Sequence, residues 1–358
     1  MTNESLDPVL QEDLENIVRG GFDFRKLDGR RVLVTGATGL IGSQIVKAIL
    51  CADRLLGISV HAVAAVRSRQ KAEKVFAGIM DRPQLDILVG DIRDEMDWEG
   101  DVDYIVHCAS ATSSRYFVEN PVETIATALD GTRAVLEFAR KKKVGGMVYL
   151  SSLEVYGVPQ AGRETVTEED YGYIDPLKVR SSYSEGKRMA ECICASYAGE
   201  YGVPVKIARL SQTFGAGVEY DDGRVYAEFA RCAIEGKDIV LHTSGSTVRT
   251  YLYTADAVSA ILTILLQGEE GTAYNVTNTA ARISIRDMAS LVCRIFPQAG
   301  IHVTFDCPED ISSFGYNPEM VIVLDDTRLR ALGWQARADL ETMFSRLVRS
   351  MTLSRKDH

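Results

Sequence analysis

RVLVTGATGLIGSQIV, residues 31–46, runs from an apolar segment through three glycines into a second apolar segment. Val32, Leu33 and Val34 form the short continuous run that is typical of a buried parallel strand. Ile41 and Ile45 then recur at helical spacing. The period of the apolar residues therefore changes at the glycines, which predicts a strand, a tight turn and a helix.

The three glycines of this turn suit a dinucleotide phosphate site. Gly36 can adopt the tight turn, Gly39 lets the backbone approach a pyrophosphate, and Gly42 lets the helix pack closely on the strand. The helix N-terminus adds free N–H groups and a positive partial charge. Glycine-rich turns also serve as plain connectors, but the strand before and the helix after this one favour dinucleotide binding.

The composition is that of an ordinary globular protein. Of 358 residues 46% are hydrophobic, enough for a sizeable core, and the formal net charge of -10 argues against a nucleic-acid partner. The acidic N-terminus lacks the pattern of a secretory signal, and the most apolar stretch, residues 252–266, is too short to cross a membrane. Seven scattered cysteines fit reduced thiols, and no His/Cys cluster has ligand spacing. We therefore expect a cytoplasmic chain with no membrane partner and no metal.

Strands and helices alternate along most of the chain, which predicts an α/β fold with a Rossmann-like, doubly wound parallel sheet. Strands are expected at the glycine-rich segment and near 59–66, 87–91, 104–109, 146–151 and 205–210, with long helices over 121–142 and 182–201. Beyond residue 211 the pattern is less regular, with a strand expected over 238–242 and helices near 225–235, 256–267 and 284–295.

This pattern predicts three parts of the chain. Residues 1–28 form an N-terminal helical extension, with the amphipathic segment 8–28, and residues 29–210 form the dinucleotide-binding domain. Residues 211–358 form mainly a smaller, mixed substrate-binding domain, from which segments such as 243–265 return to the first domain.

Arginines follow the second predicted strand at the position where many dinucleotide folds carry a carboxylate. An acidic residue there binds the adenosine ribose hydroxyls, whereas an arginine accommodates a 2′-phosphate. Arg67 and Arg69 stand there without an Asp or Glu, which favours NADP(H) over NAD(H), although both arginines could also be simply solvated. Asp91 closes the third strand and is placed to meet the adenine.

A tyrosine, a lysine and a serine predict an acid–base site. Tyr183 and Lys187 are four residues apart on a predicted helix and share one face. A neighbouring ammonium and a nicotinamide cation favour the phenolate of a tyrosine, which can then exchange a proton with a sugar hydroxyl or ketone. Ser152, at the end of the fifth strand, can hydrogen-bond the same oxygen. A lone Tyr-x-x-x-Lys pair is weak evidence, but the glycine-rich turn and the strand-end serine make it specific.

Together these motifs resemble the extended short-chain dehydrogenase/reductases of the NAD-dependent epimerase/dehydratase family, which act on nucleotide sugars. The resemblance covers about residues 29–345 and rests on TGATGLIG (35–42), GD (90–91), SLEVYG (152–157), YSEGK (183–187) and GSTVR (245–249). It implies that Tyr183 is the catalytic acid/base, that Lys187 orients the nicotinamide ribose and lowers the tyrosine's pKa, and that Ser152 binds the reacting oxygen.

The same resemblance implies the ligand contacts. Cofactor contacts are expected at Gly36, Thr38, Gly39, Leu40, Ile41, Gly42, Arg67, Arg69, Asp91, Ile92, Ala109, Tyr183 and Lys187. Substrate contacts are expected at Ser152, Gln212 and Arg249, of which Arg249 would bind the pyrophosphate of a nucleotide sugar. A homodimer through the helices 122–142 and 183–201 is also implied.

A few positions separate the activities within this family. Dehydratases carry an Asp-Glu pair after the serine, whereas this chain has Leu153-Glu154, which disfavours dehydration. UDP-glucuronate decarboxylases keep the glutamate and resemble the stretch RSSYSEGKR (180–188), but their late Arg-Arg-x-Pro-Asp-like segment reads GYNPEM here (315–320). Ala128 and Gln212 replace asparagines of many relatives.

As a whole the sequence looks like bacterial reductases of 4-keto-6-deoxy nucleotide sugars. The hypothesis is NADPH-dependent reduction at C4, with Tyr183 as the acid and Glu154 either positioning the sugar or moving a second proton. The alternatives are an NAD-dependent nucleotide-sugar 4-epimerase, a UDP-glucuronate decarboxylase-like enzyme, and a dinucleotide-binding regulatory protein without catalysis.

Overall fold

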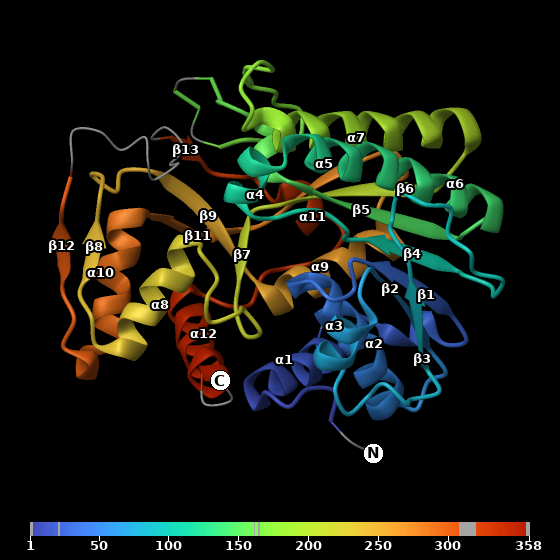
Figure 1. Ribbon diagram of the computed structural model, residues 1–358, viewed down its shortest axis with the longest axis horizontal. Helices are drawn as coiled ribbons and strands as arrows, with labels where there is room; N and C mark the ends of the chain where they lie inside the picture. Colours follow the sequence, from blue (N-terminus) through green and yellow to red (C-terminus); the bar gives the residue numbers. More distant parts are fainter. Residues whose placement is uncertain (1–2, 21, 161, 164, 308–319, 356–358) are drawn as a thin grey trace.

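A seven-stranded parallel sheet forms the centre of the computed structural model, which describes residues 3–20, 22–160, 162–163, 165–307 and 320–355 (Figure 1). The strand order is β10-β6-β5-β4-β1-β2-β3, and every pairing in the sheet is parallel. The strands are β1 (Arg31–Thr35), β2 (His61–Val66), β3 (Leu85–Val89), β4 (Tyr104–His107), β5 (Gly146–Ser152), β6 (Val205–Leu210) and β10 (Ala273–Val276). The predicted Rossmann-like α/β fold is confirmed.

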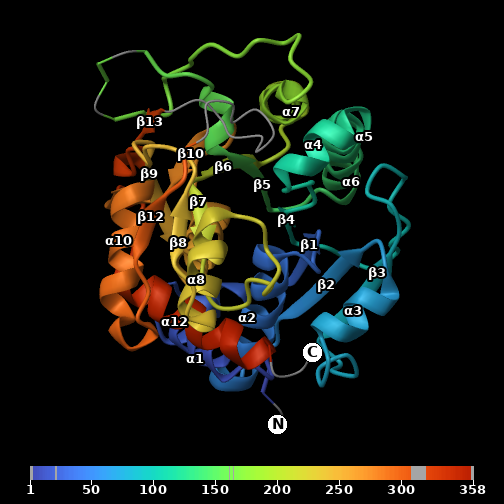
Figure 2. The ribbon, with the colours of Figure 1, turned by 60° about the vertical axis from the view of Figure 1, so that its left-hand side comes forward.

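Helices cover both faces of this sheet (Figure 2). Val32 and Val34 of β1 pack in one core with α2 (Leu40–Leu56) and α9 (Thr254–Gln267), while Leu33 packs in another with α6 (Thr132–Lys142) and α7 (Ser181–Tyr201). Alternate residues of a strand point to opposite faces, so a sheet buried on both sides needs the continuous apolar run seen in the sequence. The remaining elements on these faces are α3 (Arg69–Val75), α4 (Ser114–Glu119), α5 (Pro121–Ala126), the π-turn Thr127–Gly131 and the 3-10 turn Leu153–Tyr156.

Strand order reverses between β4 and β1, so the loops that follow these two strands diverge at the carboxyl edge of the sheet. A buried hydrogen bond ties the two strand ends together, because the Thr35 hydroxyl lies 2.7 Å from Nδ1 of His107. The same hydroxyl accepts a hydrogen bond from the Ala109 amide at 3.2 Å. His107 therefore has a structural task, and its burial lowers its pKa to about 3.

The rest of the chain builds a second core on smaller sheets. Strands β7 (Gln212–Phe214), β9 (Val248–Tyr253), β11 (Asn278–Ser284) and β13 (Val321–Ile322) form one sheet, and β8 (Ile239–Leu241) pairs with β12 (Val303–Phe305). Their core includes Phe214, Tyr251 and Phe344, together with the helices α8 (Val225–Glu235), α10 (Ile285–Ile295) and α12 (Leu340–Arg355). The segment 243–265 is divided, since β9 lies in this second sheet whereas α9 packs under the main one.

Several elements differ from the sequence expectations. The expected helix over 8–28 is a shorter helix α1 (Pro8–Arg19), followed by the 3-10 turn Phe24–Leu27. The third strand runs over Leu85–Val89 instead of 87–91. The four-residue strand β10 was not expected, although it completes the main sheet beside β6. Short elements η4 (Pro297–Ala299) and α11 (Thr327–Arg330) complete the described chain.

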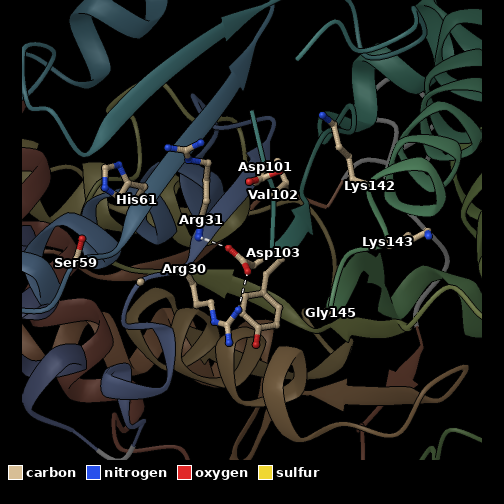
Figure 3. Close-up of a pocket in the computed structure, with 12 residues that line it drawn as sticks. Arg30, Arg31, Ser59, His61, Asp101, Val102, Asp103, Lys142, Lys143 and Gly145 are labelled. Atoms are coloured by element: carbon tan, nitrogen blue, oxygen red, sulfur yellow. Dashed lines mark hydrogen bonds and ion pairs between the residues drawn. The ribbon is translucent and has the colours of Figure 1, made fainter. Parts of the chain in front are cut away.

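A cleft lies at the amino edge of the main sheet (Figure 3). It has a volume of about 720 Å³ and is lined by residues that precede or begin β1, β2, β4 and β5, among them Arg30, His61, Asp103 and Lys143. Arg30 forms an ion pair with Asp103 at 2.9 Å across it. Ligands of parallel α/β sheets bind at the carboxyl ends of the strands, so this cleft is not the candidate active site. No helix in the described part of the chain is long and apolar enough to span a membrane.

The N-terminal segment is fastened to both cores. The Glu4 carboxylate, fully buried, binds Arg54 at 2.9 Å and Arg82 at 2.8 Å. On the other side of α1, Asp13 forms an ion pair with Arg346 of α12 at 2.8 Å. Burial raises the pKa of Glu4, but the hydrogen bonds from Arg54 and Gln11 and the charges of both arginines outweigh it and bring the pKa from 4.5 to about 2.

Replacing Glu4 with Gln removes the buried carboxylate that pairs with both Arg54 and Arg82, while Arg54 keeps its second partner Glu15 at 3.2 Å. We expect a loss of about 3 kcal/mol of unfolding free energy. Because the folded-state pKa is depressed, this contribution is present above pH 4.5 and disappears as the pH falls towards about 2. Urea unfolding at several pH values measures the contribution of Glu4 to the free energy of unfolding. Glu12→Gln, which removes a surface partner of Arg346, is the matched control and should cost less than about 0.5 kcal/mol. Equal losses for the two variants would contradict the expectation.

Candidate active site

The glycine-rich turn leaves no room for side chains on the sheet side. Gly36 has φ +61, and a Cβ there would lie 2.8 Å from the backbone N of Ala109. A Cβ on Gly42 would lie 2.5 Å from the carbonyl oxygen of Gly36. The helix α2 begins directly after Gly39, and because the N-cap is a glycine, no side chain satisfies its first amides. The turn therefore has the shape and the free amides that suit a dinucleotide pyrophosphate, and the cofactor contacts expected at Thr38, Leu40 and Ile41 stay predictions.

The ends of β2 and β3 form the side of the site expected to hold the adenosine. Arg67 is exposed beyond β2, and Arg69 is the first residue of α3. The Asp91 carboxylate accepts two hydrogen bonds at 3.0 Å from Arg93, which also pairs with Glu123 at 2.8 Å. The side-chain hydrogen bond from Arg93 and, more weakly, the charge of Arg67 lower the pKa of Asp91. Asp91 is thus already bound by an arginine that the sequence did not single out.

Ile92 lies on the inner side of the same loop. Its Cγ2 would be 3.0 Å from a Cβ on Gly131, so it packs against the π-turn between α5 and α6.

Tyr183 lies half-buried at the start of α7, beside the end of β5. Its ring stacks on Phe117 of α4 with the centroids 4.1 Å apart, and Ser152 lies close enough to its hydroxyl to lower its pKa. Burial raises the pKa of Tyr183 and the charge of Glu154 adds to the rise, whereas the Ser152 hydrogen bond and the charges of Arg180 and Arg224 oppose it. The structure therefore brings Ser152 and Tyr183 together.

Lys187 lies one helical turn further along α7. Its ammonium is 5.9 Å from the centroid of the Tyr183 ring and donates a hydrogen bond to the carbonyl of Leu150 at 2.6 Å. Burial lowers the pKa of Lys187 to about 8, and the charge of Glu191 opposes that shift. Ser152, Arg180 and Arg224 lower the pKa of Tyr183, whereas the pKa-lowering task that the family resemblance implies for Lys187 stays a prediction.

Glu154 has both carboxylate oxygens occupied. Arg180 donates to each of them at 2.9 Å, and the Ser184 hydroxyl donates to Oε2 at 3.1 Å. The Arg180 guanidinium also lies 4.9 Å from the centroid of Phe117, the ring on which Tyr183 stacks. The neighbouring Leu153 is buried and supplies no carboxyl. Glu154 is therefore a fixed ionic partner within the site.

Arg249 of β9 makes no ion pair or hydrogen bond with any described side chain. Burial lowers its pKa, while the charges of Glu154 and Arg180 also act on it. These charges place Arg249 near the Glu154–Arg180 pair. Gln212 lies half-buried on β7, the strand that pairs with β9, and the segment 315–319 lies outside the described residues.

A buried polar network, which sequence reasoning missed, holds α7 on the sheet. Arg209 of β6 is 2% exposed and binds Glu191 of α7 at 2.7 Å. Ser151, next to Ser152, donates a hydrogen bond to the same carboxylate. Glu191 follows Lys187 by one helical turn, so this network fixes the lysine and the serine relative to each other.

The chain belongs to the NAD dependent epimerase/dehydratase family, whose model matches residues 32–277. It is thus an enzyme of the extended short-chain dehydrogenase/reductase class, a class that depends on NAD(H). The chain is 31% identical over 288 residues to UDP-glucuronic acid decarboxylase 6 of Arabidopsis thaliana, with 78% of each chain covered.

Solved structures show the same fold. UDP-glucose 4-epimerase from Thermotoga maritima, with UDP-glucose, superimposes with a TM-score of 0.73 at 20% identity, covering 90% of this chain and 99% of the other. The dTDP-glucose 4,6-dehydratase DesIV from Streptomyces venezuelae, with NAD bound, gives a TM-score of 0.74 at 23% identity, covering 91% and 98%.

Replacing Gly42 with Ala puts a Cβ against the Gly36 carbonyl, so the turn must open and dinucleotide affinity should fall roughly 10- to 100-fold. Isothermal titration with NAD+ and NADP+ measures the loss. Gly199→Ala on α7 is the matched control, since a Cβ there meets nothing within 4 Å. Unchanged affinity in a folded Gly42→Ala variant would show that the turn does not hold the dinucleotide.

Proposed function

We propose that this enzyme reduces the C4 ketone of a 4-keto-6-deoxy nucleotide sugar. The observation that carries the proposal is the combination of a Tyr183 that lies beside Ser152 with a Glu154 that is held on both oxygens by Arg180. Elimination of water needs a free acid and base beside the sugar, and here position 153 is a buried leucine. Reduction of a ketone transfers one hydride and one proton, and it needs only the tyrosine as its acid.

In this reaction bound NADPH supplies the hydride to C4. Tyr183 donates its phenolic proton to the O4 atom as that oxygen gains charge, and Ser152 hydrogen-bonds the same oxygen. The raised pKa of Tyr183 keeps it protonated at neutral pH, which suits an acid in the reducing direction. Lys187, charged below a pKa of about 8, can turn from the Leu150 carbonyl to hydroxyls of the nicotinamide ribose.

Arg249 and Gln212 are proposed to bind the substrate. A cation that is largely buried and has no partner among the described residues is stabilised by an anionic ligand, and the pyrophosphate of a nucleotide sugar is such a ligand. The second core, residues 211–358, then supplies most of the substrate contacts, and residues 29–210 hold the cofactor.

NADP(H) is the proposed cofactor, because Arg67 and Arg69 follow β2 and the nearby Asp91 is already bound by Arg93. Because Asp91 is not a free carboxylate, the positive charges of Arg67 and Arg69 are available to bind a 2′-phosphate.

A homodimer is also proposed. Val122 and Ile125 of α5 and Met189 of α7 are 74%, 40% and 51% exposed, and these two helices pack side by side (Figure 1). A second copy would cover this apolar face, and sedimentation equilibrium tests it.

A UDP-glucuronate decarboxylase is the second candidate function. The 31% identity to the Arabidopsis decarboxylase and the retained Glu154 favour it. It requires NAD to be regenerated in each cycle, so it predicts carbon dioxide release from UDP-glucuronate with no net change in nicotinamide absorbance.

The purified enzyme with a freshly generated 4-keto-6-deoxy nucleotide sugar should consume NADPH stoichiometrically, measured as loss of its absorbance. Tyr183→Phe should lower turnover about 1000-fold because the proton donor is gone, while NADPH affinity changes less than about twofold. Full turnover in Tyr183→Phe would overturn the mechanism. No NADPH consumption, with NAD released on denaturation, would overturn the reductase assignment in favour of an epimerase or the decarboxylase.

Replacing Arg67 with Ala should weaken NADPH binding about tenfold, since a charged hydrogen bond to the 2′-phosphate is lost, and leave NADH binding unchanged. Titration of the intrinsic fluorescence with each nucleotide measures this difference. Tighter binding of NADH than of NADPH by the unaltered chain would make the cofactor proposal wrong.

A further inference from the structure

We propose that Arg180 is a positioning residue that neutralises Glu154 beside Tyr183, so that the tyrosine, and not the glutamate, exchanges the proton with the substrate. The inference rests on the proposed acid–base role of Tyr183 and assigns a task to a residue outside the Ser152, Tyr183 and Lys187 set.

The geometry of Arg180 is fixed from two sides. Its guanidinium donates to Oε1 and Oε2 of Glu154 at 2.9 Å each, the two-pronged arrangement that only arginine offers a carboxylate. Its flat face lies 4.9 Å from the centroid of Phe117, and Phe117 in turn stacks on Tyr183. Side-chain exposures of 23% for Arg180 and 21% for Glu154 show a pair that is largely removed from solvent.

Arg180 can reach Glu154 because of the positions of the two residues in the chain. Arg180 is the N-cap residue of α7, three residues before Tyr183, while Glu154 lies in the 3-10 turn that follows β5. The ion pair therefore joins the two segments that carry the acid–base groups, and Ser184 of α7 adds a third hydrogen bond to the glutamate at 3.1 Å.

Charges face Tyr183 from each element around it. The turn after β5 contributes Glu154, the start of α7 contributes Arg180, and the residue before α8 contributes Arg224, which is itself bound by Asp222. Lys187 lies further along α7, with its ammonium 5.9 Å from the centroid of the Tyr183 ring.

The neutral neighbours are Ser152 and Tyr149 of β5 and Phe117 of α4. Tyr183 is thus flanked by two carboxylate–guanidinium pairs, and removing one member of a pair leaves a net charge beside it.

The pairing of Glu154 with Arg180 also separates the role of Glu154 from that of Tyr183. Charged hydrogen bonds from Arg180 occupy both oxygens of Glu154, and these are among the stronger hydrogen bonds in proteins. The glutamate is thereby committed to the arginine, its negative charge opposes ionisation of Tyr183, and the positive charge of Arg180 compensates it.

A double-substitution cycle tests this compensation. Arg180→Met, Glu154→Gln and the double variant are compared in the oxidising direction, with NADP+ and the alcohol product, where the rate rises with pH as Tyr183 becomes a base. Arg180→Met should move this rise about one pH unit higher, and Glu154→Gln should move it lower. The double variant should return close to the original profile. Shifts in the same direction, no shifts, or additive losses in the double variant would overturn the proposal.

Arg188→Met is the matched control for a purely structural effect. Arg188 also lies on α7 and holds the same turn, through the carbonyls of Val155 at 2.6 Å and Gly172 at 2.7 Å. Its removal should lower thermal stability without moving the pH profile. A shift as large as that of Arg180→Met would assign the effect to the position of α7 and overturn the charge argument.

A second readout needs no turnover. In the NADP+ complex of a chain labelled with 13C at tyrosine Cζ, the Tyr183 signal, identified by its loss in Tyr183→Phe, should titrate in the same order across the four proteins. If the unaltered chain fails to use the ketone, the proposed function fails, yet this titration still decides whether Arg180 neutralises Glu154. An unchanged Tyr183 midpoint in Arg180→Met overturns the inference independently.

Discussion

The site depends on one constraint, the near contact of backbone with backbone where the turn after β1 passes the loop after β4. Gly36 faces Ala109 so closely that a Cβ would lie 2.8 Å from its backbone, and Gly42 approaches the Gly36 carbonyl still more closely. Glycine is needed at these places because no rotamer change relieves a clash between a Cβ and main chain. The hydrogen bond between Thr35 and His107 holds the same two strands at their ends. Through this contact α2 points its free amides into the crevice where the strand order reverses.

Electrostatic pairing then decides which side chains can respond to a ligand. In the described part of the site, Glu154 is paired with Arg180, Asp222 with Arg224, and Asp91 with Arg93. Arg249 has no such partner there. A largely buried charge without a partner is costly, which is why Arg249 is the proposed contact for an anionic ligand. The paired groups are held by partners within the chain, which favours a preorganised site.

Local patterns in the sequence were enough for the strand, turn and helix at 31–46 and for the shared face of Tyr183 and Lys187, because both depend on spacing within one segment. They could not reveal the pair of Glu154 with Arg180, whose members lie 26 residues apart on different elements. Strand β10 was missed because a four-residue segment containing the polar Asn275 has no clear period. In the structure that asparagine is fully buried, and its side chain is satisfied by carbonyls of Val166 and Asp325. Partners that lie far along the chain satisfy such polar residues in a core, and only the folded structure reveals them.

The buried network beneath the site also affects the charge of Lys187. Removal from water disfavours its charge, and Glu191, one turn away, restores part of it. Glu191 can do so because Arg209 and Ser151 hold its carboxylate in place. The lysine therefore remains a cation near neutral pH, and among the described residues the Leu150 carbonyl is its one hydrogen-bond acceptor, although an ammonium can donate three hydrogen bonds. Within the described chain, Lys187 and Arg249 are thus the cations that have donors to spare, whereas Glu154 and Glu191 are bound by arginines.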